Sequence, residues 1–548
     1  MERVLTEQEI PVPISASLEA NLAWLKQAFG AASDLVVRRF RLGPRTGLFA
    51  AAVFLNHAVD MSTVNGLILK TAMEEPVHPE TLPYGRQFNP VAFVQYLWEH
   101  MFPVAKGQVI ARLDEARNAI PDGALVILLD GFVQGLVLEV QKWPKRQPTE
   151  PSGEAVIRGP HLGFVEDLST NCALIRNRLR HADLRIEQLA IGRRSRTAVA
   201  LVYIHGLTNP QLVAEARRRL SFIDTDVITD ISLVEGFIQD APYSVFPTLQ
   251  STERPDRLEF FLMEGRLAVL ADGSPRALVA PSVFWDLFQS PEDAYHRFPY
   301  PSFMRALRLV AGLLSLFMPS LYVAIVTFHP EMIPTDLAMA IAASRAPLPL
   351  PAVAEAFLME LAMEMVREAG IRLPSPIGQT IGIVGAVVLG QAAVAARIVS
   401  PLMVIVVAST AIASFVVPSF NIVVGIRLLR FPLLLFSSTL GLYGLMVGFV
   451  AIVLHQVGLS SFGVPYMTPL APQYASSARE TILHTPSWRG SLRPRWLHPQ
   501  ERQKQAWFTR LWGQGDLNLL RRARRRKAAP CAGPNPTPQN PDPQPPCG

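Results

Sequence analysis

Residues 432–454 read PLLLFSSTLGLYGLMVGFVAIVL and end an eighty-residue stretch, Ile377–Gln456, that contains three arginines and no acidic residue. The arginines are Arg397, Arg427 and Arg430. A bilayer core about 30 Å thick is crossed by about 20 mostly apolar residues in a helix, so the stretch has room for three spans. The expected spans are Ile377–Ala396, Ile398–Pro418 and Pro432–Leu454, with the arginines at the membrane surface.

A further apolar run, Leu309–Phe328, follows Arg305 and Arg308 and brings the expected number of spans to four. Residues 1–30 contain four glutamates and lack the cationic start and apolar core of a signal peptide, so the N-terminal half is expected to stay in the cytoplasm. The polybasic run Arg521–Lys527 favours a cytoplasmic location for the C-terminus as well. Both termini are therefore predicted to be cytoplasmic, which requires an even number of crossings.

The distribution of charge predicts a soluble half followed by a membrane half. The chain has 548 residues, which is too many for one hydrophobic core, and its net charge of +6 comes largely from the C-terminal tail. The predicted fold is an α/β cytoplasmic N-terminal half and an α-helical integral membrane C-terminal half. Its parts are an N-terminal tail at 1–33, a first α/β subdomain at 34–147, a second α/β subdomain at 154–300, a transmembrane helical domain at 304–470 and a basic, Pro-rich, disordered tail at 471–548.

Short apolar runs and turn residues predict the elements of the two α/β subdomains. The first subdomain is expected to contain strands at Asp34–Arg41, Thr46–Leu55, Ala124–Leu129 and Leu136–Val140, and helices at Met61–Met73 and Pro90–Met101. The second is expected to contain helices at Gly163–Leu179 and Pro210–Leu220, and strands at Leu184–Ile191, Thr197–Tyr203, Leu258–Leu262 and Ala268–Leu270.

The segment between the first span and the rest contains a predicted helix, Pro351–Ala369, with proline at its first position and glycine just after its end. Glu360, Glu364 and Glu368 recur every four residues and share one face of this helix. The helix can lie on the membrane surface, dip into it or line a water-filled path. In the last case the three glutamates are candidate pore-lining residues, and the neighbouring Leu361 and Met365 are candidates for an apolar constriction.

Three glycines of the first predicted span in the long stretch, Gly378, Gly382 and Gly385, have a spacing that allows close packing of helices. Ordinary tolerance of glycine in membrane helices explains the same pattern. A large side chain at Gly382 is a direct test of the packing role.

No Walker loop, HExxH or GxSxG motif is present, so we expect no enzymatic activity and no cofactor. His329 and Glu331 form a weak candidate metal pair that is better explained as interfacial polar residues. The three cysteines, Cys172, Cys531 and Cys547, show neither metal-ligand spacing nor a disulfide framework.

Nine short motifs, ordered over residues 34–472, resemble those of the GerA-type spore germination proteins, specifically the A subunits of nutrient germinant receptors. In the soluble half they are RGPHLGFVED at 158–167, NCALIR at 171–176, SVFP at 244–247, TERPD at 252–256 and DGSP at 272–275. In the membrane half they are FHPEMIP at 328–334, EAGIRLP at 368–374, IVG at 383–385 and GVPY at 463–466. Cys172 and the long basic, Pro-rich tail depart from the family pattern.

The resemblance implies a protein of the spore inner membrane that works with a transporter-like B subunit and a lipoprotein C subunit. It also implies a homo-oligomer that forms a nutrient-gated cation channel and triggers germination. Two alternatives stay open at this point: a secondary transporter, and a non-conducting scaffold or sensor of the type of a sporulation-stage paralogue. A transporter is disfavoured because the membrane half shows no repeated, interrupted helices.

Overall fold

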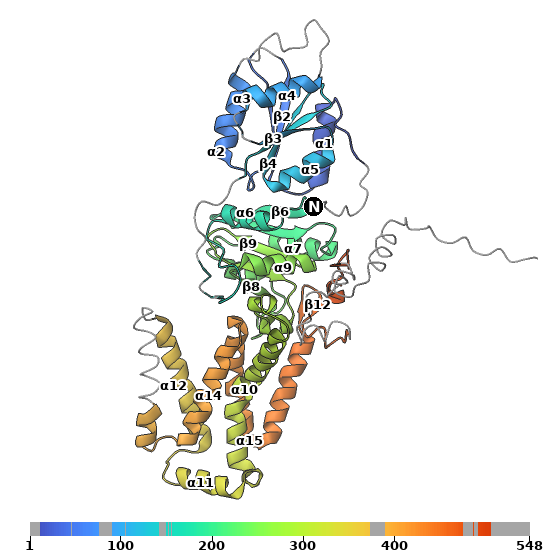
Figure 1. Ribbon diagram of the computed structural model, residues 1–548. Coiled ribbons are helices and arrows are strands. Elements are labelled where there is room, and N and C mark those ends of the chain that lie inside the picture. Colours follow the sequence, from blue (N-terminus) through green and yellow to red (C-terminus); the bar gives the residue numbers. More distant parts are fainter. Residues whose placement is uncertain are drawn as a thin grey trace, which may run out of the picture. The chain divides into compact units, whose positions relative to one another are not determined.

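The computed structural model describes residues 11–44, 47–75, 90–102, 104, 106–141, 150, 151, 153, 154, 156–372, 390–474, 486 and 492–505. The chain divides into two compact units, Met1–His484 with Pro494–Gln500 and Thr485–Arg493 with Glu501–Gly548. The described part of the smaller unit contains an isolated β-bridge between Leu492 and Gln503. The larger unit contains two α/β subdomains and a group of apolar helices (Figure 1).

The first α/β subdomain is built on a five-stranded antiparallel sheet with the order β1-β2-β4-β5-β3. The strands are β1 (Leu35–Arg41), β2 (Phe49–Leu55), β3 (Gly107–Ile110), β4 (Ala124–Leu129) and β5 (Gly135–Glu139). β4 is an uninterrupted apolar run that is buried along its whole length, because helices cover both faces of the sheet.

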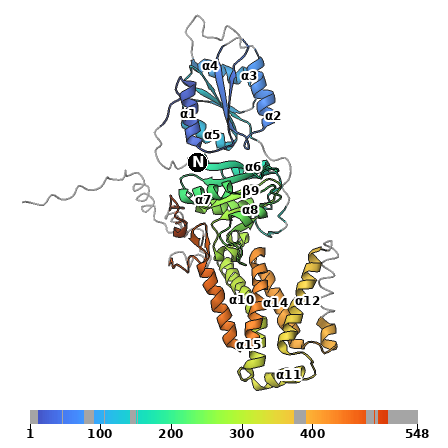
Figure 2. The same ribbon diagram turned by 180° about the vertical axis from the view of Figure 1, so that it is seen from behind.

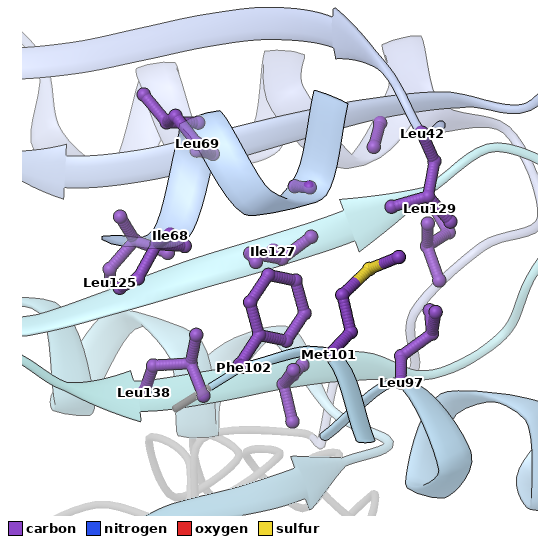
Figure 3. Packing of buried hydrophobic residues seen from close by; sticks show 14 of the residues in the cluster. Leu42, Ile68, Leu69, Leu97, Met101, Phe102, Leu125, Ile127, Leu129 and Leu138 are labelled. Carbon is purple, nitrogen blue, oxygen red and sulfur yellow. The ribbon is translucent and has the colours of Figure 1, made fainter. Parts of the chain in front are cut away.

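Two apolar layers fill the first subdomain, one on each face of its sheet. One face is covered by α1 (Leu18–Phe29) and α5 (Leu113–Ala119), which continues into η3 (Ile120–Asp122). The other face is covered by α2 (Met61–Thr63), the π-helical η1 (Val64–Leu69), α3 (Lys70–Glu74) and α4 (Pro90–Met101). In Figure 3, Phe102 and Met101 lie over Ile127 of β4 in this second layer.

The second α/β subdomain repeats the strand order of the first, as β6-β7-β9-β10-β8. Its strands are β6 (Leu184–Ile191), β7 (Thr197–Ile204), β8 (Gln250–Thr252), β9 (Leu267–Ala271) and β10 (Ala277–Ala280). Helices α6 (Leu168–Arg178) and α9 (Pro255–Glu264) cover one face, and α7 (Pro210–Ser221) and α8 (Ile231–Ile238) cover the other. With the continuous segments α2–η1–α3 and α5–η3 each counted as one helix, both subdomains have the same succession of elements along the chain, so the soluble half is a structural duplication.

A buried ion pair joins the two subdomains. Arg176 of α6 donates two hydrogen bonds, both 3.0 Å long, to the carboxylate of Asp34, and neither side chain is exposed. Beside it, Ser33 donates a hydrogen bond to the Ile186 carbonyl at 2.8 Å, and Arg185 donates one to the Ala28 carbonyl at 2.8 Å. The two hydrogen bonds between Arg176 and Asp34 pair two charges removed from water, which is a requirement for burying them, and the contacts of Ser33 and Arg185 add to the same junction.

The helical half follows short 3-10 segments, and in both views its longer helices lie side by side while α11 (Thr335–Arg345) lies across one end of them (Figures 1 and 2). The helices are α10 (Tyr300–Phe328), α11 (Thr335–Arg345), α12 (Ala352–Arg372), α14 (Pro401–Val416) and α15 (Phe420–Gly458). The short segments are η4 (Phe284–Phe288), η5 (Pro291–Ala294), η6 (Pro330–Met332) and η7 (Arg495–Leu497), and the strands after α15 are β11 (Ser460–Ser461) and β12 (Val464–Pro465). In the described part of the chain, α10 and α15 are long and apolar enough to cross a membrane, and α14 is a shorter apolar helix.

Most expected elements of the soluble half match the structure, but one expected strand and two expected domain boundaries differ. The expected strand at Leu258–Leu262 is part of helix α9, which starts at Pro255 and ends before Gly265 in the left-handed conformation. The first subdomain begins before residue 34, because α1 packs into its core. Residues 494–500 belong to the folded unit and not to a disordered tail, since Trp496 and Leu497 pack on Val283.

Replacing Arg176 with Met is expected to lower the free energy of unfolding of the soluble half by about 3 to 5 kcal/mol, because Asp34 is left buried without a cation. The matched control is Arg39→Met, whose ion pair with Glu19 is exposed, and it should cost at most about 1 kcal/mol. Denaturant titration monitored by tryptophan fluorescence measures both. Adding Asp34→Leu to Arg176→Met should recover part of the loss, and equal effects of the two single changes would contradict this account.

Candidate functional site

Helix α12 contains the glutamates expected to line a pathway, and it stands along α14. Near its start, Glu355 Oε2 accepts a hydrogen bond from the backbone N–H of Ser400 at 2.9 Å. Near its end, the Arg367 guanidinium lies 5.5 Å from the centre of the Phe415 ring. Ser400 caps the start of α14 and Phe415 lies in its last turn, so the two helices run in the same direction. The helix therefore belongs to the bundle and does not lie flat across it.

Helix α15 is a helical hairpin whose two limbs, 420–440 and 442–458, meet at Gly441. This glycine has φ 61° and ψ −140°, a conformation open to glycine alone. A Cβ on Gly448 would lie 2.5 Å from Leu433 Cδ2, and a Cβ on Gly444 would collide with the Phe436 carbonyl oxygen. In one straight helix Phe436 and Gly444 would be about 12 Å apart. The chain therefore reverses at Gly441, and glycines let the limbs approach closely.

Arg430 on the first limb of α15 connects three helices. Its Nη1 donates to Glu360 Oε2 at 3.0 Å, and its Nη2 donates to Ser315 Oγ of α10 at 2.6 Å. Arg430 and Glu360 are each 3% exposed. The span boundaries expected from the sequence place Arg430 at a membrane surface, but α15 starts at Phe420, so this arginine lies inside a helix and inside the bundle.

A second ion-pair layer lies one helical turn further along α12. Glu364 accepts hydrogen bonds from Arg427 of α15 at 3.1 Å and from Arg367 of its own helix at 2.9 Å. Arg427, like Arg430, was expected at a membrane surface and instead contacts α12. Because Arg427 and Arg430 are three residues apart, both reach the same neighbouring helix.

At the start of α12, Glu355 is completely buried and forms a third polar layer. Its Oε1 lies 3.5 Å from Arg345 Nε at the end of α11. Along α12, the acids at Glu355, Glu360 and Glu364 thus each face a cation within the same chain, and no two of them share one. In each of these three layers a negative charge is paired with a positive one, as buried charges require.

The predicted pore-lining residues do not all share one side of α12 in this structure. Glu360 and Glu364 turn toward α15, whereas Leu361 and Met365 are 43% and 61% exposed on the outer side. Glu368 is also exposed. Glu360 and Glu364 of α12 are therefore paired with cations inside the bundle, whereas Leu361, Met365 and Glu368 are exposed.

The other candidate residues are placed as follows. Gly378, Gly382 and Gly385 lie outside the described residues. His329 Nδ1 and Glu331 Oε1 are 3.5 Å apart at the end of α10. In the part of the chain that the structure describes, no group of three His, Cys, Asp or Glu side chains is placed to hold a metal ion.

The second α/β subdomain is packed on the bundle through an apolar cluster. The cluster combines Phe246, Leu287 and Phe288 of the subdomain with Ile422 and Ile426 of α15. The β11–β12 hairpin, which follows α15 directly, adds polar contacts. There, Ser461 Oγ donates to the Thr248 carbonyl at 2.6 Å and accepts from the Ser282 N–H at 3.1 Å. The second limb of α15 is thus connected to the second sheet by the β11–β12 hairpin.

These features define a class of protein: a duplicated α/β soluble half fixed to an apolar helical bundle with internal ion pairs. A family model described as Bacillus/Clostridium GerA spore germination protein matches residues 23–496. The chain belongs to the GerA family, and the resemblance seen in its motifs is confirmed.

Two relatives in this family match over nearly their whole length. Spore germination protein KA of Bacillus subtilis (strain 168) is 38% identical over 499 residues, which cover 91% of this chain and 90% of that protein. Spore germination protein GerLA of Bacillus cereus is 39% identical over 490 residues, which cover 88% and 97%. The crystal structure of the N-terminal domain of the A subunit of the Bacillus megaterium spore germinant receptor GerK3 is 27% identical, covers 50% of this chain and 99% of that chain, and has a TM-score of 0.39.

If α15 is a hairpin, the pair Leu433→Cys with Gly448→Cys should form a disulfide within one chain on mild oxidation, because Leu433 Cγ lies 3.9 Å from the position of a Cβ at 448. The control pair Leu433→Cys with Gly458→Cys should not, since Gly458 lies near the opposite end of its limb. Both pairs are made with Cys531→Ser and Cys547→Ser and scored by mass spectrometry of peptides. Equal crosslinking of the two pairs, or none at 433 and 448, would contradict the hairpin.

Proposed function

We propose that this chain is an A-type subunit of a nutrient germinant receptor in the spore inner membrane. In this role it is not an enzyme and uses no cofactor. It forms a homo-oligomer that conducts cations when a nutrient signal arrives. Family membership supports the place in germination, and the apolar helices α10 and α15 support insertion into a membrane.

The observation that carries the proposal is the set of matched charges along α12. Ionisable groups in a membrane bundle are costly, and proteins that keep them commonly use them for ion movement. Here Glu360 and Glu364 are neutralised by Arg430 and Arg427, while Leu361 and Met365 form the outer, apolar side of the same helix. We assign this arrangement to the closed state.

In an oligomer with α12 nearest the axis, Leu361 and Met365 then form rings that exclude water and hold the pathway shut. Opening turns α12 about its own axis, so that the ion pairs separate and the glutamates face the pathway as acidic rings that favour cations. The β11–β12 hairpin and the apolar cluster around Phe288 give the soluble half a direct mechanical link to α15, and through the ion pair of Arg430 with Glu360 to α12.

The partners in this proposal are a transporter-like B subunit, a C-type lipoprotein and further copies of the same chain. The N-terminal domain and the C-terminal tail are placed in the cytoplasm, on one side of the membrane. The reversal at Gly441 divides the expected span Pro432–Leu454 between two limbs, and α12 also stands in the bundle. Two passes are thus added to the four expected from the sequence, and their number stays even.

A non-conducting scaffold or sensor is the competing function, and one observation favours it. Each glutamate from Glu355 to Glu364 on the inner side of α12 already has a cation in its own chain, as in a rigid structural collar. A secondary transporter is a weaker alternative, because nothing in the described bundle corresponds to a pair of interrupted helices in repeated halves.

Potassium flux from liposomes that contain the purified receptor distinguishes these functions. Glu360→Gln and Glu364→Gln, singly and together, should raise flux in the absence of nutrient, since the pairs that hold α12 are weakened. Both should also lower permeability for cations relative to anions. The control is Glu331→Gln, whose side chain is 70% exposed outside the bundle. Unchanged flux and selectivity at normal protein levels would rule out α12 as the lining of an ion pathway and would leave it the role of a structural collar.

A further inference from the structure

Tyr243 is completely exposed at the tip of the segment that joins α8 to β8. A single exposed aromatic side chain is common on a protein surface, and the place of Tyr243 in the fold decides what it can contact. The segment around it, residues 239–247, is called the tyrosine loop below. It lies where the second α/β subdomain meets the helical bundle.

The tyrosine loop is held firmly, so the exposure of Tyr243 is a property of the fold. On one side of the tip, Asp240 accepts hydrogen bonds from Arg219 Nη2 at 2.8 Å and from the Phe462 N–H at 2.7 Å. On the other side, Ser244 Oγ is hydrogen-bonded to His455 Nε2 at 2.9 Å. The tip is thus fixed between α7, the β11–β12 hairpin and the second limb of α15.

Contacts of Val245 set the level of the loop along the bundle. The Val245 carbonyl oxygen lies 2.6 Å from the position of a Cβ on Gly425, and Val245 packs in the cluster that contains Ile422 and Ile426. Gly425 is in the second turn of the first limb, and His455 is in the last turn of the second limb. The loop therefore lies beside the ends of both limbs, where the apolar surface of the hairpin begins.

That apolar surface continues past the loop. Val450, Leu454 and Val457 lie on one face of the second limb and are exposed, and Phe420 at the start of the first limb is 68% exposed. Tyrosine combines an apolar ring with a polar hydroxyl, and it is enriched where membrane helices leave the hydrocarbon for the headgroups.

We propose that the tyrosine loop is a lipid contact of the soluble half, with the Tyr243 ring at the boundary between headgroups and acyl chains. The inference rests on the membrane location proposed above. It adds that the second subdomain touches the bilayer directly, so that the membrane surface helps to set the position of this subdomain relative to α15.

The test places an environment-sensitive nitrobenzoxadiazole label on single cysteines in the full chain. Tyr243→Cys carries the test label, Leu435→Cys labels the exposed middle of the first limb, and Val133→Cys labels an exposed turn of the first subdomain. Cys531 and Cys547 are replaced with Ser. Cys172 is kept, because burial and the nearby Asp34 raise the pKa of its thiol to about 12, so it reacts poorly with maleimides.

The labelled proteins are placed in phosphatidylcholine and phosphatidylglycerol vesicles with and without bromine on the acyl chains near the headgroups. We expect bromine to quench the label at 243 by roughly half or more of the quenching at 435, and the label at 133 not at all. Quenching at 435 with none at 243 overturns the lipid contact and leaves membrane insertion intact.

Two further outcomes are informative. A blue-shifted emission at 243 without quenching by bromine means that protein, such as a second copy of the chain, covers the loop, and it overturns the proposal. Absence of quenching at both 435 and 243 overturns the membrane location itself. The label at 435 therefore separates failure of this inference from failure of the proposed function.

Discussion

A guanidinium inside an apolar bundle has to find an anion, and in this protein Arg430 finds Glu360. Leaving either charge alone would cost several kcal/mol, so the pair determines how α15 and α12 face each other. Ser315 takes the second donor of Arg430 and brings α10 into the same constraint. The layer formed by Arg427 and Glu364 repeats it one turn away. A helix with an acidic face can stand in the bundle because these partners meet that face.

The soluble half is arranged so that a change in it can reach this bundle. Its two subdomains share one topology and are joined by the buried pair of Asp34 and Arg176. The second subdomain shares an apolar cluster with the start of α15, and the β11–β12 hairpin ties the end of α15 to the second sheet. Both ends of α15 are therefore held by the subdomain, while Arg427 and Arg430 of its first limb hold α12.

Local sequence patterns were sufficient for most of the fold. Strands such as Ala124–Leu129 and Leu184–Ile191, and helix Pro90–Met101, were predicted at their observed bounds, because their apolar periodicity and flanking turn residues act locally. The duplication was not recognised, since strand order depends on pairing between distant segments. Leu258–Leu262 was misassigned because a short apolar run suits a strand or a helix, and the proline and glycine that delimit α9 decide it.

For the candidate site, the acids of α12 were found from their spacing, but their partners were missed. Arg427 and Arg430 were assigned to span boundaries, although arginines within a long apolar stretch are themselves a signal for buried pairing. The reversal at Gly441 could not be predicted from the sequence, because glycine is common in membrane helices and does not by itself indicate a turn.

The central claim is that Glu360 and Arg430 act as one unit that fixes α12 in the bundle. A double-mutant cycle on the full chain in mixed micelles tests it most directly, with Glu360→Gln, Arg430→Gln and the double variant compared by their free energies of unfolding. The account predicts that each single change is strongly destabilising and that the double variant costs less than the sum by about 1 to 3 kcal/mol. Additive effects within about 0.5 kcal/mol would show that the two side chains act independently, and would contradict it.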